Sequence, residues 1–348
     1  MIDTFPINTS WSEHLEKKVQ NMFYYDTRWL ELLAKFYGYQ IIPLTTKNAD
    51  GQVTGFLPLC FIRSPLTGRR LVSLPFSDYC PLVAVDEANT TQLIEQALHI
   101  AQEKQVKYLE LRSGANEVLA QRADFTVNNL YVNWVLPLAG TAEEAWLGLR
   151  KPVQQQIKKS QKAGVQVRAA QSREDMDIYY RLHLNTRTRK HGMPAQSQNY
   201  FHALWDTFAA SGTMRLLLAE SAGMPIAGII LFAAGSTLHY AYGASDESYL
   251  KFAPNNLLFW EAITWGSVSG YKSLDFGRTA CNNSGLMEFK RRWGAIQEPM
   301  PYYYYPQTAG LASTSESSWK YRMLTNNWRK LPLAVAGPLG GYVYKHLG

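Results

Sequence analysis

One lysine near the end of the chain stands where a cation could act in a reaction. Lys290 lies in the segment 285–295, just after an apolar stretch that ends in Asp275-Phe276-Gly277-Arg278. A cation beside a strand end can stabilise the negative charge that develops in acyl transfer, either on the carbonyl oxygen or on the leaving group. The alternative is that Lys290, Arg291 and Arg292 form only a solvated basic surface.

A second candidate group follows a strand in the first half of the chain. Asp78 lies in the proline-bounded segment 75–81 and could bind an amine or accept a proton. The alternative is that its carboxylate only caps the backbone of its own turn. Asp275 and Arg278 occupy a similar place in the second half, and Tyr79, Tyr242 and Asn255 complete the polar and aromatic groups that we expect near the strand ends.

The positive charge of the chain is concentrated in one stretch. The net charge is +7, while residues 150–190 hold eleven basic and three acidic side chains. Residues 150–163 read as a helix that ends at Gly164, with Lys158, Lys159 and Lys162 on one side. Such a helix suits a diphosphate or a tRNA backbone, although a plain surface helix would have the same composition.

A further basic group lies in the segment 184–194. Arg187, Lys190 and His191 are expected to face a substrate groove. His191 is a poor candidate for a catalytic base, because a histidine in a basic run resists a second positive charge and has no carboxylate near it in the sequence.

The same order of elements occurs twice. Two strands, a loop, a helix and a strand that ends at Arg112 recur in the second half, where the last strand ends at Arg278. This repetition predicts an α/β (α+β) fold of two tandem units, each with a mixed, mostly antiparallel sheet flanked by helices. The uncharged stretch 221–245 reads as two buried strands joined at Gly235-Ser236 rather than as a membrane span.

The expected organisation is a first unit over 1–138, a second unit over 139–306 that carries the active site, and a linker with a basic, apolar tail over 307–348. The tail could lie on an anionic membrane face through residues 319–348, or pack back on the body. The N-terminal residues are polar and acidic, so a cytoplasmic protein is expected, with peripheral contact to the inner face of the plasma membrane as an option.

The pattern Gly285-x-x-x-Phe289-Lys290-x-x-x-Gly294 resembles a motif of the FemAB-type aminoacyltransferases, which are built from two acetyltransferase-like (GNAT) units. The resemblance covers about residues 20–305 and extends to the basic helix and to the segment 186–194. It implies functional roles for Phe289 and Lys290, with the lysine acting on the aminoacyl-tRNA and the transition state. It also implies that the basic helix lies near phosphate groups of the substrate.

One departure from the GNAT pattern concerns the acyl donor. Acetyl-CoA-binding units carry a glycine-rich turn whose backbone N–H groups hold the pyrophosphate. The segment 249–256 has no glycine, and Pro254 has no N–H to donate. Neither this segment nor 86–91 in the first half looks built for CoA, so another donor such as aminoacyl-tRNA is expected.

The predicted function is therefore transfer of an aminoacyl or other acyl group onto an amine of an anionic, diphosphate-containing envelope precursor. That amine belongs to a peptidoglycan stem peptide or to an amino sugar. Lys290 and Asp78 are the expected catalytic residues, and no metal, cofactor or DNA is implied. Two alternatives stay open, namely an acyltransferase of exopolysaccharide assembly that uses another donor, and a non-catalytic protein that binds a lipid-linked precursor.

Overall fold

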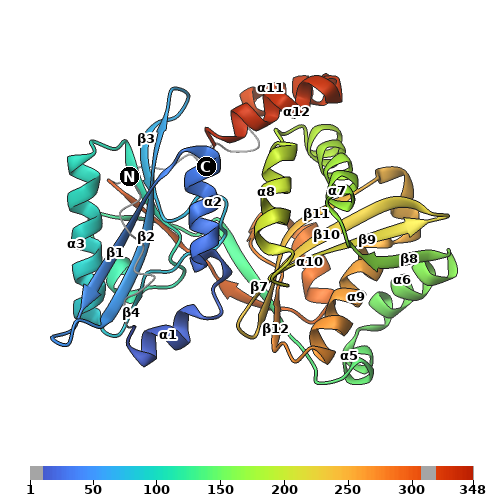
Figure 1. Ribbon diagram of the computed structural model, residues 1–348, viewed down its shortest axis with the longest axis horizontal. Coiled ribbons are helices and arrows are strands. Elements are labelled where there is room, and N and C mark those ends of the chain that lie inside the picture. Colours follow the sequence, from blue (N-terminus) through green and yellow to red (C-terminus); the bar gives the residue numbers. More distant parts are fainter. Residues whose placement is uncertain (1–10, 307–318, 348) are drawn as a thin grey trace.

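The computed structural model describes residues 11–306 and 319–347, and these residues form two β-sheets that lie side by side (Figure 1). Across the molecule the layers follow in this order: one helix, the first sheet, a central group of helices, the second sheet and a pair of outer helices. The predicted α/β fold with two mixed sheets flanked by helices is confirmed.

The first sheet has the strand order β1-β2-β3-β5-β15-β6, with β4 paired to β2. Every neighbouring pair is antiparallel except β3 and β5. Its strands are β1 (Gln40–Lys47), β2 (Val53–Ser64), β3 (Gly68–Val72), β4 (Val83–Ala84), β5 (Tyr108–Leu111), β6 (Thr126–Asn128) and β15 (Tyr302–Tyr305). Helix α3 (Glu87–Glu103) covers the outer face with Leu93, Ile94 and Ala97.

The second sheet has the order β13-β7-β12-β11-β10-β9-β8, with β14 paired to β7. Here β11 and β12 are the parallel pair. Its strands are β7 (Tyr131–Pro137), β8 (Val165–Ala169), β9 (Met214–Ser221), β10 (Met224–Ala234), β11 (Thr237–Ser245), β12 (Ser273–Asp275), β13 (Thr279–Ala280) and β14 (Ile296–Pro299). The expected hairpin within 221–245 is confirmed as β10 and β11, and no helix among the described residues is long and apolar enough to cross a membrane.

The two faces of the second sheet pack against different helices. Alternate residues of β9 point in opposite directions: Leu216 and Leu218 face the central helices, while Leu217 and Ala219 face the outer pair. The central helices are α2 (Thr27–Tyr37), α7 (Arg173–Asn185) and α8 (Gln198–Phe208), and the outer pair is α6 (Lys151–Lys162) and α9 (Pro254–Val268). The central layer also packs on the first sheet, so both units share one hydrophobic core.

The remaining helical elements connect these layers. They are α1 (Glu13–Val19), η1 (Phe23–Tyr25), α4 (Glu117–Ala120), α5 (Ala142–Gly148), η2 (Thr186–His191), η3 (Glu247–Phe252), α10 (Ser284–Arg292), α11 (Trp319–Lys330) and α12 (Leu333–Tyr344).

The predicted duplication corresponds to β1-β2-β3-α3-β5 in the first unit and β9-β10-β11-α9-β12 in the second. The next strand in each sheet comes from the other segment of the chain. Strand β15 belongs to the second unit of the sequence but pairs with β5 in the first sheet. Strand β7 belongs to the first unit but pairs with β12 in the second sheet. The boundary predicted near residue 138 therefore separates the helices of the two units but not their sheets.

The tail helices α11 and α12 lie on the body beside α7 and α8 (Figure 1). Small residues allow this close approach: a Cβ on Gly192 would stand 2.5 Å from the carbonyl oxygen of Thr325, and one on Gly340 would stand 2.9 Å from that of Ala195. The tail thus packs on the body. The predicted linker at 307–318 lies outside the described residues.

The docking of the tail can be tested at Gly192, whose φ of +63° is also unfavourable for other residues. Gly192→Ala should cost roughly 1–2 kcal/mol of backbone strain, and its methyl group should displace α11. Gly164→Ala is a matched control, because Gly164 has a φ of +74° and open space around it. Hydrogen exchange of residues 319–347 should accelerate only in Gly192→Ala, and equal protection in both variants would contradict the docked arrangement.

Candidate active site

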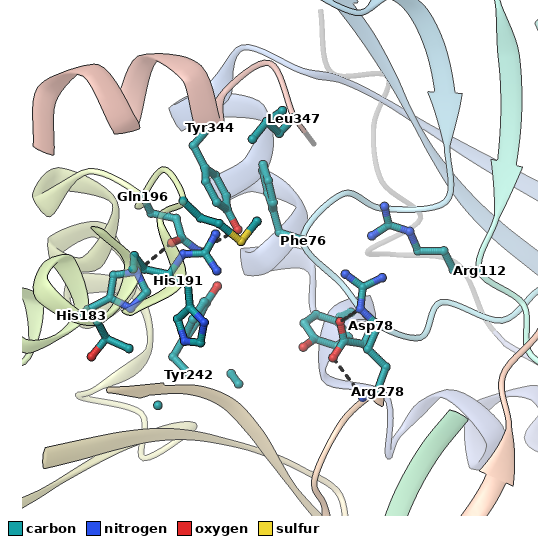
Figure 2. A pocket seen from close by; sticks show the side chains of 16 residues that line it. Phe76, Asp78, Arg112, His183, His191, Gln196, Tyr242, Arg278, Tyr344 and Leu347 are labelled. Atoms are coloured by element: carbon teal, nitrogen blue, oxygen red, sulfur yellow. Dashed lines mark hydrogen bonds and ion pairs between the residues drawn. The ribbon is translucent and has the colours of Figure 1, made fainter. Parts of the chain in front are cut away.

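The site forms where the parallel strand pairs of the two sheets separate. Strands β3 and β5 remain paired up to Val72 and Glu110, and β11 and β12 up to His239 and Asp275. Beyond these points the members of each parallel pair separate, and Arg112 and Arg278 follow the ends of the equivalent strands β5 and β12. Both arginines line one pocket of about 440 Å³ that also receives Asp78 (Figure 2). The duplication thus brings two equivalent cations to a single place.

The pocket is lined by residues from both units and from the tail. Its lining residues are Tyr24, Phe76, Asp78, Arg112, His183, Thr186, Arg187, His191, Met193, Gln196, Ala241, Tyr242, Gly243, Arg278, Tyr344 and Leu347. Five of the predicted residues are among them, namely Asp78, Arg187, His191, Tyr242 and Arg278.

Asp78 and Arg278 join the two units across this pocket. Arg278 Nε lies 2.9 Å from Asp78 Oδ1, and the Arg278 backbone N–H donates to Asp78 Oδ2 at 3.3 Å. Gly277 permits this contact, because its φ is +69° and a Cβ there would stand 2.9 Å from Asp78 Oδ2. Arg278 Nη1 also donates to the Tyr302 hydroxyl at 3.1 Å, and that hydroxyl donates to the Asp78 carbonyl at 2.5 Å. Asp78 thus lines the pocket and contacts Arg278 of the other unit, rather than only capping its own turn.

Arg112 is held as firmly as Arg278. Its Nε donates to Glu110 at 2.7 Å, and its Nη1 donates to the carbonyls of Ser77 at 2.7 Å and Leu74 at 3.3 Å. Burial favours loss of the proton, but the Glu110 carboxylate outweighs it and raises the pKa of Arg112. For Arg278, burial is likewise outweighed by Tyr302 and Asp78, and the pKa is raised. Both side chains therefore remain cations. The sequence shows Arg112 only as the residue that ends a strand. Because Arg278 ends the equivalent strand of the second unit, the repeat could have predicted that Arg112 also lies at the site.

Lys290 lies behind the loop that carries Arg278. Its side chain is buried, with 3% of the residue exposed, and it does not line the pocket. Its ammonium donates to the carbonyls of Phe276, Gly277 and Arg278 at 2.8, 2.8 and 3.2 Å. Three carbonyls that the sheet leaves unpaired at the end of β12 thus share one donor group. Lys290 therefore holds the backbone of the loop that carries Arg278, and we propose that it positions the Arg278 side chain in this way.

A chain of polar side chains, most of them outside the predicted set, lines the opposite wall. His183 Nε2 lies 3.0 Å from Gln196 Oε1, and because an amide oxygen only accepts, Nε2 carries the hydrogen. Gln196 Nε2 donates to the Tyr344 hydroxyl at 3.0 Å, and Tyr242 and Tyr200 are joined through their hydroxyls at 2.8 Å. Burial first, and then Arg187, lower the pKa of His183 to about 3, so this ring is neutral. The sequence did not predict that His183 lines the pocket, because a single histidine on an apolar helix face is more often part of the core.

The segment 186–191 forms a π-helical turn that continues α7 and directs Arg187 to the pocket. Arg187 Nε donates to the Pro194 carbonyl at 3.1 Å. Burial and the Arg187 charge lower the pKa of His191, in agreement with the expectation that this ring resists protonation. Lys190 is exposed and is not among the lining residues, and its carbonyl accepts from Arg329 of the tail.

Four other predicted residues, Asp275, Phe289, Tyr79 and Asn255, do not line the pocket. Asp275 accepts from the Gly277 N–H at 2.8 Å and faces His239, so it shapes the loop before Arg278. Phe289 packs on Phe259 in the outer core. Tyr79 packs against Gly114, and Asn255 lies in the first turn of α9.

The basic helix is on the far side of the second sheet. Lys158, Lys159 and Lys162 are exposed on α6, which packs with α9 on the outer face, while the pocket opens on the face covered by α7. These lysines and a ligand confined to the pocket therefore cannot touch. In the described part of the chain, no group of three or more histidine, cysteine or acidic side chains could hold a metal ion.

Comparison with protein families and curated proteins identifies relatives of part of the chain. Residues 148–291 match an acetyltransferase (GNAT) domain. The chain is 38% identical over 85 residues to a lipid II:glycine glycyltransferase of Staphylococcus haemolyticus, covering 23% of this chain and 20% of the relative. The corresponding protein of Staphylococcus saprophyticus is 31% identical over 102 residues, covering 27% and 25%. The chain thus matches a fifth to a quarter of the length of these curated relatives.

Similar solved structures cover more of the chain. FemX matches 84% of this chain and 95% of its own, with a TM-score of 0.65 and 16% identity. L-PGS from Bacillus licheniformis matches 88% of this chain and 98% of its own, with a TM-score of 0.56 and 14% identity. At these identities the likeness concerns the fold. The predicted resemblance to the FemAB-type aminoacyltransferases and their tandem GNAT-like fold is confirmed.

The three-carbonyl contact makes Lys290→Met the informative substitution. Loss of the donor should cost about 1–3 kcal/mol of unfolding free energy, and kcat should fall because Arg278 is no longer held in place. Arg292→Met is the matched control, since Arg292 is exposed on the same helix and pairs only with Glu288. Denaturant unfolding and steady-state kinetics measure both effects, and a Lys290→Met enzyme with unchanged kcat would remove the positioning role.

The pH dependence separates positioning from simple loss of stability. Burial lowers the pKa of Lys290 from its usual 10.5 to about 8, although Asp78 and Asp275 oppose the shift. Between these values the unfolded chain binds more protons, so this group's contribution to the unfolding free energy increases with pH. The kcat should instead fall above the folded-state pKa, because a neutral amine has two N–H bonds for three carbonyls. Lys290→Met should lack this decline.

Proposed function

We propose that this protein is an acyltransferase that moves an aminoacyl group onto an amine of a peptidoglycan precursor. The observation that carries the proposal is that Arg112, Arg278 and Asp78 meet in one pocket between two GNAT-like units. The names of the glycyltransferase relatives favour this acceptor over an exopolysaccharide, and they favour an enzyme over a non-catalytic binder.

The pocket offers complementary groups for the two parts of such an acceptor. Arg112, Arg187 and Arg278 would bind the phosphates, because guanidinium groups present parallel N–H donors that fit phosphate oxygens. Asp78 would receive the ammonium of the acceptor, since its carboxylate is the one acidic group on the pocket wall. A substrate held at both ends would present its amine in a fixed direction, and this orientation would supply much of the rate.

The reaction needs a neutral amine and a place for its protons. The amine nitrogen attacks the carbonyl carbon of the aminoacyl ester, the C–N bond forms, and the C–O bond to the carrier breaks. One proton leaves the ammonium before attack, towards Asp78 or water, and the second leaves with the carrier as its hydroxyl hydrogen. Arg278, held in place by Lys290, would stabilise the oxyanion or the leaving oxygen.

Aminoacyl-tRNA is the donor that we propose. The turn before α9 places Ala253 at a φ of +54° and then Pro254, which leaves no glycine-rich turn for a CoA pyrophosphate. Lys158, Lys159 and Lys162 would then contact the long tRNA backbone, because a large polyanion can reach the outer face of the sheet while its acylated end enters the pocket.

The transfer can be tested with the purified full chain, a lipid-linked muramyl pentapeptide and total aminoacyl-tRNA. Mass spectrometry should detect the acceptor with one added amino-acid residue. Arg278→Gln should lower kcat/KM by roughly 10- to 100-fold, the value of a charge-assisted hydrogen bond. Arg173→Gln is the control, because Arg173 lies in an exposed ion pair with Asp206. Turnover with acetyl-CoA alone would instead make the protein an acetyltransferase.

We further propose that the tail contacts an anionic membrane from which the precursor is reached. The exposed apolar side chains of its two helices are Met323, Leu324, Val335, Leu339 and Tyr342. The basic Arg329 and Lys330 lie at the end of α11, and Lys345 directly follows α12. Apolar side chains flanked by basic ones suit the surface of an anionic bilayer.

Sedimentation with phosphatidylglycerol-containing vesicles tests this membrane contact. The wild-type protein should pellet with the vesicles, and a Leu324→Glu/Leu339→Glu variant should remain in the supernatant. Leu147→Glu is the control, because Leu147 is equally apolar, is 74% exposed and lies on α5 away from the tail. Equal sedimentation of all three proteins would refute a contact through the tail.

A further inference from the structure

The pocket has two chemically different ends. Figure 2 shows Asp78 and Arg278 on one side, and Phe76, Tyr344 and Leu347 on another. The first side is charged and comes from the strand ends, whereas the second is apolar and aromatic. Two of the three apolar residues, Tyr344 and Leu347, belong to the tail. The tail lies outside residues 20–305, which the resemblance to the FemAB-type enzymes covers.

Tyr344 is fixed between the two units. Its ring stacks on Phe76 of the first unit with centroids 4.8 Å apart and planes at 24°. Its hydroxyl accepts from Gln196 Nε2 of the second unit at 3.0 Å, and Gln196 is in turn bonded to His183. A side chain held on both sides has few alternative rotamers, so Tyr344 forms a defined surface of the pocket.

The residues that follow Tyr344 are anchored to the first unit by their backbone. The carbonyl of His346 accepts from Arg70 Nη2 and from Thr67 Oγ1, both at 3.0 Å, and the carbonyl of Lys345 accepts from Tyr39 at 2.5 Å. Arg70 is itself buried, with 2% of the residue exposed. These three bonds hold the chain across the gap between the units and fix the position of Leu347.

Leu347 remains 45% exposed although it lines the pocket. A ligand that covers this exposed apolar surface removes it from water, and this burial stabilises the bound state. The charged end binds an anion, so the ligand that fits both ends is an anion that carries an apolar group.

We infer that the carboxyl-terminal turn of α12 and the residues after it form an apolar subsite, and that Tyr344 and Leu347 determine which apolar group can accompany a phosphate in the pocket. The inference rests on the proposed function only for the phosphate held by Arg112 and Arg278. The ligand class is a phosphate ester with an apolar substituent.

Binding of a homologous series to the full chain tests this subsite without any turnover. The probes are inorganic phosphate, ethyl phosphate, butyl phosphate and hexyl phosphate, measured by calorimetry below their aggregation concentrations. The wild-type protein should bind each longer ester more tightly, by at most about fourfold per buried CH₂. Leu347→Ser should lose most of this gain, and Leu347→Trp should accept ethyl phosphate but bind hexyl phosphate no better.

Leu147→Ser is the matched control, because it makes the same substitution at a leucine that is 74% exposed, lies on α5 and does not line the pocket. It should keep the full gain along the series, and thermal melting of every variant establishes that it is folded. Equal affinity for all four probes in the wild-type protein, or an undiminished gain in Leu347→Ser, would overturn the subsite. Because only binding is measured, a failure of the aminoacyl-transfer assay would leave this result unaffected.

Discussion

The exchange of one strand between the two sheets is the constraint on which the site depends. Strand β15 lies in the first sheet although it belongs to the second unit of the sequence, and β7 lies in the second sheet although it belongs to the first. The units also share the core formed by α2, α7 and α8. Neither unit can rotate away from the other without breaking sheet hydrogen bonds. Arg112 and Arg278 can therefore face one pocket at a fixed separation, and Tyr302 of β15 can bridge Arg278 and Asp78.

The position of Lys290 shows how a buried charge can be maintained near such a site. An ammonium group loses hydration when it is buried, and this cost lowers its pKa to about 8. The carbonyls of residues 276–278 recover part of the cost, because the chain there has left the sheet and these oxygens have lost their strand partners. The lysine and the loop thus satisfy each other, and the direction of Arg278 follows from that arrangement.

Local pattern was sufficient to predict the repeated elements and the residues at their ends. The apolar periodicity of α3, the turn at Gly235-Ser236 and the arginines after β5 and β12 are all encoded within short segments. This pattern was enough to place Asp78, Arg187, His191, Tyr242 and Arg278 close to one site. It also predicted that His191 resists protonation, in agreement with the lowered pKa of its ring.

The remaining features depend on contacts between distant segments. Nothing in the composition of β7 or β15 tells which sheet will accept them, because a place beside β5 and a place beside β12 suit the same kinds of residue. The sequence of α6 predicts a basic helix face, but it does not show whether the helix packs on the outer or the central side of the second sheet. Lys290 could not be distinguished from Arg291 or Arg292 by residue type, since its burial is set by the loop behind which it lies. Tyr344 reaches the pocket only through the fold of the tail.

The late position of β15 in the chain also has a consequence for the order of folding. Strands β5 and β6 are made early, yet the strand between them is contributed by residues 302–305. Until that segment leaves the ribosome, the first sheet has an unfilled slot with two unpaired edges, and exposed edges invite pairing with other chains. The first sheet is therefore complete only after residues 302–305 have been synthesised. The folding of the amino-terminal half is thereby tied to the arrival of the carboxyl-terminal half, and a chain that stops early cannot present a finished pocket.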